Sequence, residues 1–508
     1  MFRIFDALND VDNMQVAIDA AQKSGRIVET AICYTGDVAD PRRTKYDLKY
    51  YVALAKEIVR RGTHLLAIKD MAGLLKPRAA TMLVSALKEA VDVPLHLHMH
   101  DTSGNGIASY MAAIEAGVEV VDGAVSSMAG MTSQPSLSSL AFALAGSPRD
   151  PQISPDAFEQ LSAYWEPVRA YYAAFESGLN APAADVYEHE IPGGQYSNLR
   201  AQAEALGVGD GWEAVKRAYA DVNRLFGDIP KVTPSSKVVG DMAIWMVKQG
   251  LDARAVTERA GELTFPESVI DYMRGSLGQP PGGFPEPLRT KILKGATVID
   301  GRPGASMPPY DWAKAKQEVE TLAGMEVARR DLVSFALYPK VMREYMEHRA
   351  LHGDTSVLPT PAFFYGLRVG EEAWIDIEPG KTLIVKLLSV GELEPDGARV
   401  LTFEVNGQSR QMRVADDSAK VTGPKRRRAT GKPGEVGAPM PGRVIDLVTK
   451  VGEHVKAGQK LLVTEAMKLE TVIKAPLDGL VREIVAGAGE SVEAGDLLVL
   501  IEEPVAAP

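Results

Sequence analysis

The chain has 508 residues, of which 45% are apolar and 24% charged, a composition typical of a globular protein with several domains. Its net charge of −11 argues against a nucleic-acid-binding protein, and it has no apolar run long enough to predict a membrane span. The single cysteine, Cys33, rules out an intrachain disulfide and favours a reducing compartment, so we expect a cytoplasmic protein.

Residues 1–145 alternate between strand-like and helix-like segments. Strands are predicted at 2–5, 29–34, 65–69, 95–100 and 118–124, with helices such as 45–60, 77–90 and 107–116 between them. This alternation predicts βαβ units with a parallel sheet, and therefore a multidomain α/β protein. About five units are visible, whereas a closed (β/α) barrel has eight. Because the chain also opens directly on a strand, we expect a partial TIM-type barrel whose first strands are missing.

Three histidines occupy alternate positions at the end of one predicted strand. His96, His98 and His100 should share a face, since side chains two residues apart on a strand point the same way. His98 and His100 could then bind one metal ion through neutral imidazole nitrogens, with Asp101 orienting a ring. The structural alternative is a set of buried histidines that only form hydrogen bonds.

Lys69 is the last residue of the preceding predicted strand, 65–69, as His100 is the last residue of 95–100. A protonated lysine would repel a divalent cation, so Lys69 can be a metal ligand only if carbamylation turns its amine into a carboxylate. The alternative is an ordinary lysine that pairs with Asp70 or Asp101. The residue pattern leaves both interpretations open.

The pattern changes twice in the middle of the chain. Residues 146–355 read as mostly helical with Gly/Pro-rich interruptions, and 356–418 alternate like the strands of a small β domain. Residues 419–434 are basic and lack apolar periodicity, which predicts a flexible linker. A nucleic-acid-binding patch is the alternative, and the acidic balance of the chain favours the linker.

Residues 435–503 contain an internal repeat. Its two copies begin at Gly442 and Gly479, at a constant offset of 37 residues, and each predicts a few short strands. Glu465-Ala466-Met467-Lys468 falls at the join, where a hairpin tip would present Lys468 to water. This lysine could carry a covalent group, or it could be an ordinary surface lysine.

Taken together, these motifs resemble the pyruvate carboxylase family. The resemblance rests on segments in the family's order: 2–6, 31–37, 69–77, 98–104, 192–195, 231–241 and 465–468. It implies that a biotin protein ligase attaches biotin to Lys468. It also implies that carbamylated Lys69, His98 and His100 bind Mn or Zn, and that the Thr233 hydroxyl moves a proton between biotin and pyruvate.

The same resemblance assigns the domains. It implies that 1–145 are the later strands of a carboxyltransferase barrel, 146–355 its helical extension, 356–418 a tetramerisation and allosteric domain, and 435–503 an all-β (hammerhead) biotin carboxyl carrier domain. The implied activity is biotin-dependent carboxylation of pyruvate to oxaloacetate by a homotetramer. Nothing resembles the family's ATP-grasp domain, so we expect ATP to act only in a missing part. Because the early barrel strands are missing as well, we expect the chain to be inactive alone.

Two other functions remain open. The chain could be the biotin-bearing carboxyltransferase subunit of an oxaloacetate decarboxylase or transcarboxylase, or a non-catalytic biotin carrier with the barrel as a scaffold. The short basic linker disfavours the first alternative, and the presence of Lys69, His98, His100 and Thr233 disfavours the second.

Overall fold

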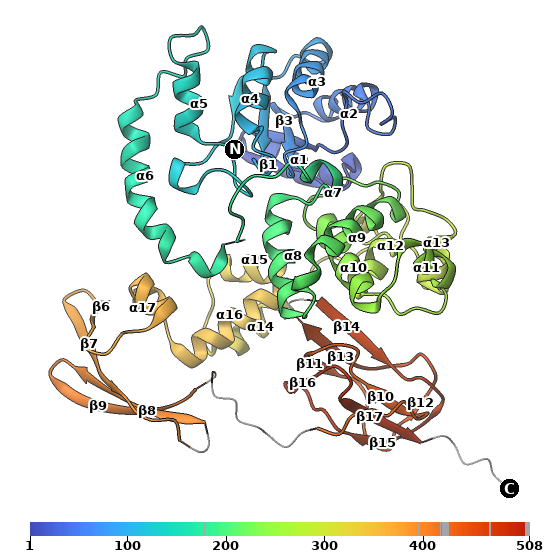
Figure 1. Cartoon of the computed structure of the whole chain (residues 1–508), viewed down its shortest axis with the longest axis vertical. Coiled ribbons are helices and arrows are strands. Elements are labelled where there is room, and N and C mark those ends of the chain that lie inside the picture. The colour runs from blue at the N-terminus through green and yellow to red at the C-terminus, as the bar shows by residue number, and fades with distance from the viewer. Residues whose placement is uncertain (177, 395–396, 417, 419–425, 467–468, 503–508) are drawn as a thin grey trace. The chain divides into compact units, whose positions relative to one another are not determined.

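The computed structural model describes the whole chain except residues 177, 395–396, 417, 419–425, 467–468 and 503–508 (Figure 1). It divides into two compact units, Met1–Ser306 together with Arg426–Pro508, and Met307–Lys425. In the part that the structure describes, no helix has the length and apolar character needed to cross a membrane.

The first unit begins with a five-stranded parallel sheet, as predicted, whose strands are neighbours in chain order. The strands are β1 (Phe2–Ile4), β2 (Val28–Cys33), β3 (Leu65–Asp70), β4 (Leu95–Met99) and β5 (Val120–Val121). The helices between them are α1 (Val11–Lys23), α2 (Leu48–Arg60), α3 (Pro77–Ala90) and α4 (Gly106–Glu115) (Figure 1). Every residue of β2 is buried, as expected for a strand covered on both faces of a parallel sheet.

A mostly helical region follows, as the periodicity indicated. Its helices are α5 (Leu137–Leu144), α6 (Pro155–Ala170), α7 (Val186–His189), α8 (Gly193–Ala205), α9 (Trp212–Leu225), α10 (Ser235–Gln249), α11 (Ala253–Arg259), α12 (Glu267–Arg274) and α13 (Leu288–Leu293). Helix α10 is buried along most of its length and forms the centre of a second apolar core. The turns before α8 and α10 contact the carboxyl end of the parallel sheet through Gly193 and Val232.

The C-terminal β-domain confirms the predicted repeat. Two four-stranded sheets have the orders β10-β17-β15-β12 and β14-β13-β11-β16, so each strand of the first repeat copy has an equivalent in the other sheet. The strands are β10 (Glu435–Gly437), β11 (Gly442–Leu447), β12 (His454–Val455), β13 (Lys460–Ala466), β14 (Leu469–Lys474), β15 (Gly479–Ile484), β16 (Ser491–Val492) and β17 (Leu497–Glu502). Strands β13 and β14 form an antiparallel hairpin in which Ala466 pairs with Leu469, so the connection that contains Lys468 lies outside the described residues.

The prediction of a flexible linker at 419–434 is wrong for residues 426–434, which the structure describes. Arg426 donates hydrogen bonds to the Val485 carbonyl (2.6 Å) and to Glu490 (2.8 Å), and Ala429 N–H donates to Gly495 O (2.9 Å). The basic, polar composition predicted a solvated linker. Local sequence could not show that its donors bind a carboxylate and carbonyl groups about 60 residues further along the chain. Residues 419–425 lie outside the described residues.

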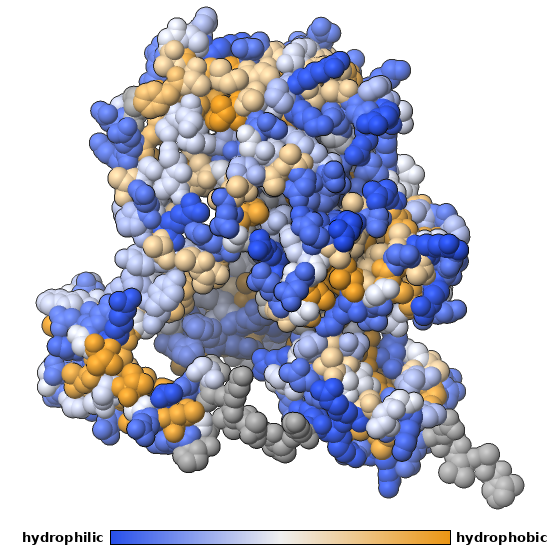
Figure 2. All heavy atoms as spheres, viewed as in Figure 1, coloured by the Kyte–Doolittle hydropathy of each residue, from blue (hydrophilic) through white to orange (hydrophobic). Residues whose placement is uncertain are grey.

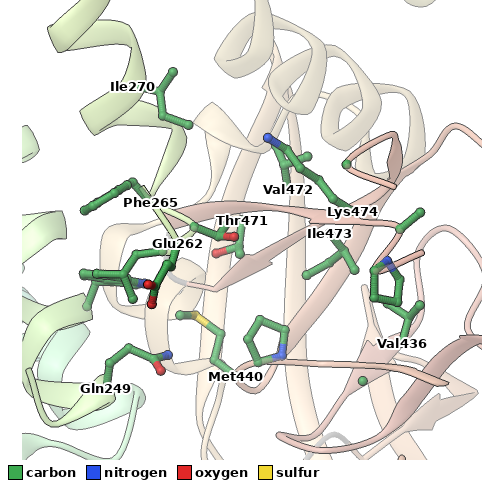
Figure 3. Close-up of a pocket in the computed structure, with 18 of the residues that line it drawn as sticks. Gln249, Glu262, Phe265, Ile270, Val436, Met440, Thr471, Val472, Ile473 and Lys474 are labelled. Atoms are coloured by element: carbon green, nitrogen blue, oxygen red, sulfur yellow. The ribbon is translucent and has the colours of Figure 1, made fainter. Parts of the chain in front are cut away.

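A cavity of about 850 Å³ lies where the β-domain meets the helices of the same unit (Figure 3). Trp245, Phe265 and Ile270 line it from the helical side, and Val472 and Ile473 from β14. Met440, from the loop between β10 and β11, also lines the cavity. Met440 is 2% exposed and packs in the apolar core of the helices, although it belongs to the β-domain.

The second unit contains a helical bundle and an antiparallel sheet. Its helices are α14 (Trp312–Ala323), α15 (Arg329–Leu337), α16 (Pro339–His352) and α17 (Thr360–Tyr365), and its strands, in sheet order, are β6 (Glu372–Glu378), β7 (Lys381–Val390), β8 (Ala398–Val405) and β9 (Gln408–Ala415). The sheet leaves large apolar side chains exposed, among them Trp374 and Met412. Figure 2 shows hydrophobic residues gathered on the surface of this β region.

Candidate active site

The candidate site lies at the carboxyl end of the parallel sheet. Lys69 pairs in register with Cys33 of β2 on one side and with His98 of β4 on the other, so the three residues form one row across adjacent strands. Neighbouring strands are about 5 Å apart, which brings the Lys69 and His98 side chains together on one face. His100 follows two residues later, and its ring centroid is 5.4 Å from that of His98.

Both histidines are held in the form that binds a metal ion. The Nδ1–H of His98 donates to Asp122 Oδ2 (2.8 Å), and the Nδ1–H of His100 donates to the Thr132 carbonyl (2.6 Å). Because these acceptors cannot donate a proton back, each ring keeps its lone pair on Nε2. Burial lowers the pKa of His98 and lowers that of His100 to about 4, so both are neutral at pH 7.

His96 has a different role. Its Nδ1 contacts Glu29 and its Nε2 contacts Asp122 Oδ1 (2.9 Å), so both ring nitrogens are engaged. Burial opposes its charge, but the hydrogen bonds to Asp122 and Glu29 raise the pKa of His96 overall. Arg3 also contacts both carboxylates. The structural alternative is therefore correct for His96, which supports the site through Asp122.

Lys69 is buried beside the two histidines and is 8% exposed. Its Nζ lies 4.8 Å from the centroid of the Phe5 ring, and among the described residues no hydrogen bond or ion pair engages it. Burial lowers the pKa of Lys69, which increases the fraction of the nucleophilic neutral amine.

The two aspartates predicted as partners serve the backbone instead. The Asp70 carboxylate accepts N–H groups of the following turn, the shortest from Leu75 (2.7 Å). Asp101 Oδ1 accepts the Gly106 N–H (2.8 Å) at the start of α4. The predictions that either pairs with Lys69, or that Asp101 orients a histidine ring, are wrong, because turn N–H groups a few residues away capture these carboxylates first.

Thr233 reaches the same edge of the sheet on the turn before α10. The preceding residue, Val232, packs with Ala7, Cys33 and Met71, which follow or end β1, β2 and β3. Thr233 itself is exposed, so its hydroxyl is open to a substrate.

Three contributors to the site were missed in the sequence. Asp122 and Thr132 fix the histidine rings, and Gly193 packs against His100 so closely that a Cβ atom there would lie 2.6 Å from His100 Nδ1. The position of Asp122 near the carboxyl end of the predicted strand 118–124 was an available signal. In the described part of the chain, no group of three or more His, Cys, Asp or Glu side chains could hold a metal ion, so His98 and His100 need a further donor.

Three family models match, described as HMGL-like over residues 9–164, conserved carboxylase domain over 186–386 and biotin-requiring enzyme over 434–501. The solved carboxyl transferase domain of Rhizobium etli pyruvate carboxylase is 49% identical with a TM-score of 0.77, over 82% of this chain and 70% of that one.

The chain belongs to the pyruvate carboxylase family. Pyruvate carboxylase of Bacillus subtilis is 52% identical over 475 residues, and the human mitochondrial enzyme 47% over 477. These matches cover 93% of this chain, and the chain spans about 40% of the length of those relatives. The family and the match to a biotin-requiring enzyme support covalent biotin as a cofactor.

Proposed function

We propose that this chain carries the carboxyltransferase site and the biotin carrier of a pyruvate carboxylase, which together move a carboxyl group from biotin to pyruvate to give oxaloacetate. The observation that carries this proposal is the row of Lys69 and His98 with His100 beside it, in which both imidazoles are neutral with a free Nε2. These residues fit a divalent ion such as Mn or Zn once Lys69 supplies a negative oxygen.

Carbamylation of Lys69 would supply that oxygen. The neutral amine attacks carbon dioxide, an N–C bond forms, and one proton leaves to solvent. The lowered pKa of Lys69 favours the reaction, because only the unprotonated amine is nucleophilic. The experiment is 13C NMR of the Zn-loaded chain in labelled bicarbonate, with Lys69→Met as control. A carbamate signal is expected in the wild type alone, and its absence there would count against carbamylation.

The bound metal would supply positive charge near the carbonyl oxygen of pyruvate, which stabilises the enolate. The exposed Thr233 hydroxyl would pass the proton between pyruvate and biotin. The assay is decarboxylation of oxaloacetate with free biotin, the reverse half-reaction, which needs no ATP. Thr233→Ala should lower the rate about 100-fold or more, whereas Thr233→Ser should keep most of it. Equal rates for the three proteins would refute the role of Thr233.

Lys468 is the proposed biotin attachment point. Strands β13 and β14 pair antiparallel up to Ala466 and Leu469, so Lys468 belongs to the connection between them, which supports this assignment. Incubation with a biotin protein ligase and ATP should add one biotin by mass spectrometry, and Lys468→Ala should add none. Lys474→Ala, on the same strand pair, is the matched control. Labelling of Lys468→Ala would refute the assignment.

The remaining domain assignments are part of the same proposal. We take the parallel sheet as part of a TIM-type barrel and the two-sheet domain as a hammerhead carrier fold. Residues 356–418 would form the tetramerisation and allosteric domain of a homotetramer. The sheet β6–β9 supports this, because Val390, Leu401 and Met412 form one row and the outer two are about half exposed. A cytoplasmic location is in keeping with a single buried cysteine.

A further inference from the structure

A buried ion pair lies behind the Thr233 turn. Lys231 Nζ is 2.7 Å from Glu190 Oε2, and the two side chains are only 2% and 7% exposed. Lys231 also donates to Thr35 Oγ1 (3.0 Å) and to the Ile229 carbonyl (3.1 Å), so two hydrogen bonds hold the ammonium group besides the ion pair. Arg43 donates to the other oxygen of Glu190 at 3.0 Å.

Glu190 and Lys231 belong to two different turns, and each precedes a residue of the site by two or three positions. Glu190 ends α7 in a left-handed conformation (φ 55°), three residues before Gly193, which packs on His100. Gly193 N–H donates to the Met71 carbonyl (2.8 Å), which fixes this turn on the end of β3. Lys231 lies two residues before Thr233. The pair therefore joins the turn that supports a histidine to the turn that carries the hydroxyl.

The other described contacts between this turn and the sheet are uncharged. Val232 makes apolar contacts with Ala7, Cys33 and Met71, and Ser235 Oγ hydrogen-bonds to Pro230 O (2.7 Å) within the turn and to Ala7 O at 3.5 Å. Lys45 binds the carbonyls of Gly227 and Asp228, but these lie at the start of the turn. The Lys231–Glu190 pair is the charged contact closest to Thr233 along the described part of this turn.

We infer that Lys231 and Glu190 are positioning residues for carboxyl transfer, which hold the Thr233 hydroxyl at a fixed distance from the His98–His100 site. This inference rests on the proposed function. A misplacement of about 1 Å in a reacting group lowers rates about 100-fold, so loss of the pair should act mainly on kcat. Substrate affinity should change little, because neither side chain is exposed to substrate.

The test uses oxaloacetate decarboxylation with free biotin by the full metal-loaded chain. Lys231→Met should lower kcat about 10- to 100-fold with KM within about twofold of wild type. In a Thr233→Ala background the same change should lower kcat less than about twofold, because the hydroxyl that it positions is gone. Lys216→Met is the matched control, since it breaks the 2.5 Å ion pair between Lys216 of α9 and Asp185, the N-cap residue of α7. A loss in the Thr233→Ala background as large as in wild type would overturn the inference.

A second readout is independent of activity. Amide hydrogen exchange of residues 231–236 should become at least about tenfold faster in Lys231→Met and remain unchanged in Lys216→Met. If wild type shows no Thr233-dependent turnover, the proposed function fails and exchange alone decides whether the pair fixes this turn. Unchanged exchange would overturn the inference. Glu190→Gln keeps the size of the side chain and removes its charge, so it gives the same comparison if Lys231→Met does not fold.

Discussion

Replacement of Gly193 by alanine tests whether backbone packing sets the orientation of His100. A Cβ atom at residue 193 would lie 2.6 Å from His100 Nδ1 and 2.6 Å from the Thr132 carbonyl oxygen. Ordinary contacts begin near 3.4 Å, so the ring and the carbonyl must move by about 0.8 Å. Such a shift breaks the hydrogen bond between them, which is now 2.6 Å long.

The energetic consequence follows from two terms. Loss of a buried hydrogen bond costs about 1–3 kcal/mol, and overpacking costs about 1–3 kcal/mol. We therefore expect Gly193→Ala to lower the free energy of unfolding by about 2–6 kcal/mol relative to Gly194→Ala. Gly194 is the matched control, because a Cβ atom there meets nothing within 4 Å and the helix-propensity gain is the same in both variants.

Metal binding gives the decisive measurement. A misplaced Nε2 on His100 should weaken Mn or Zn binding about 10- to 100-fold in Gly193→Ala, measured by competition with a chelator, whereas Gly194→Ala should bind like wild type. Urea unfolding of the metal-free proteins supplies the stability difference. If both variants matched wild type in affinity and stability, the proposed contact between this turn and His100 would be refuted.

Three further predictions concern other parts of the first unit. Asp122→Asn should weaken metal binding about 10- to 100-fold, because His98 loses the carboxylate that orients its ring, and unchanged affinity in the chelator competition would contradict this role. Burial lowers the pKa of His189 to about 4, so between pH 6.5 and 4 the unfolded chain binds a proton that the folded chain does not bind. This group should therefore lower the free energy of unfolding by up to about 3 kcal/mol between pH 6.5 and 4. Urea unfolding of His189→Gln at several pH values should show a correspondingly weaker dependence of stability on pH. Met440→Ala should cost about 2–5 kcal/mol because Met440 is 2% exposed, whereas Val451→Ala, at a position 63% exposed, should have little effect, and equal effects in urea unfolding would show that the contact with the helices contributes nothing.

Regular periodicity made much of the fold predictable. The parallel sheet, the four strands β6–β9 and the two-copy β-domain all follow from patterns that repeat every two residues or every 37. The same patterns located Lys69, His98 and His100, because parallel strands of similar length end at the same edge and alternate residues share a face.

Most of the incorrect or missing predictions have one physical cause. His96 and His98 look equivalent in the sequence, but the register places His96 beside Glu29, which is 67 residues away, and leaves His98 at the end of the strand. Gly193 and the arginines at 426–428 were likewise undecidable, since their roles depend on His100 and on acidic residues far along the chain. Contacts between residues distant in sequence carry no local signal. The predicted partners of Asp70 and Asp101 were wrong for a different reason, because backbone N–H groups of the adjacent turns bind these carboxylates.

The burial of Lys69 also makes its proposed carbamate dependent on the metal ion. An ordinary lysine with a pKa near 10.4 is neutral in only about one molecule in 2,500 at pH 7, so burial favours carbamylation by increasing that fraction. The carbamate, however, is an anion in the same buried place, and an unpaired buried charge is strongly disfavoured. His98 and His100 are neutral and cannot balance it. A divalent cation on their Nε2 atoms would do so, which means that neither the carbamate nor the bound cation should be stable without the other.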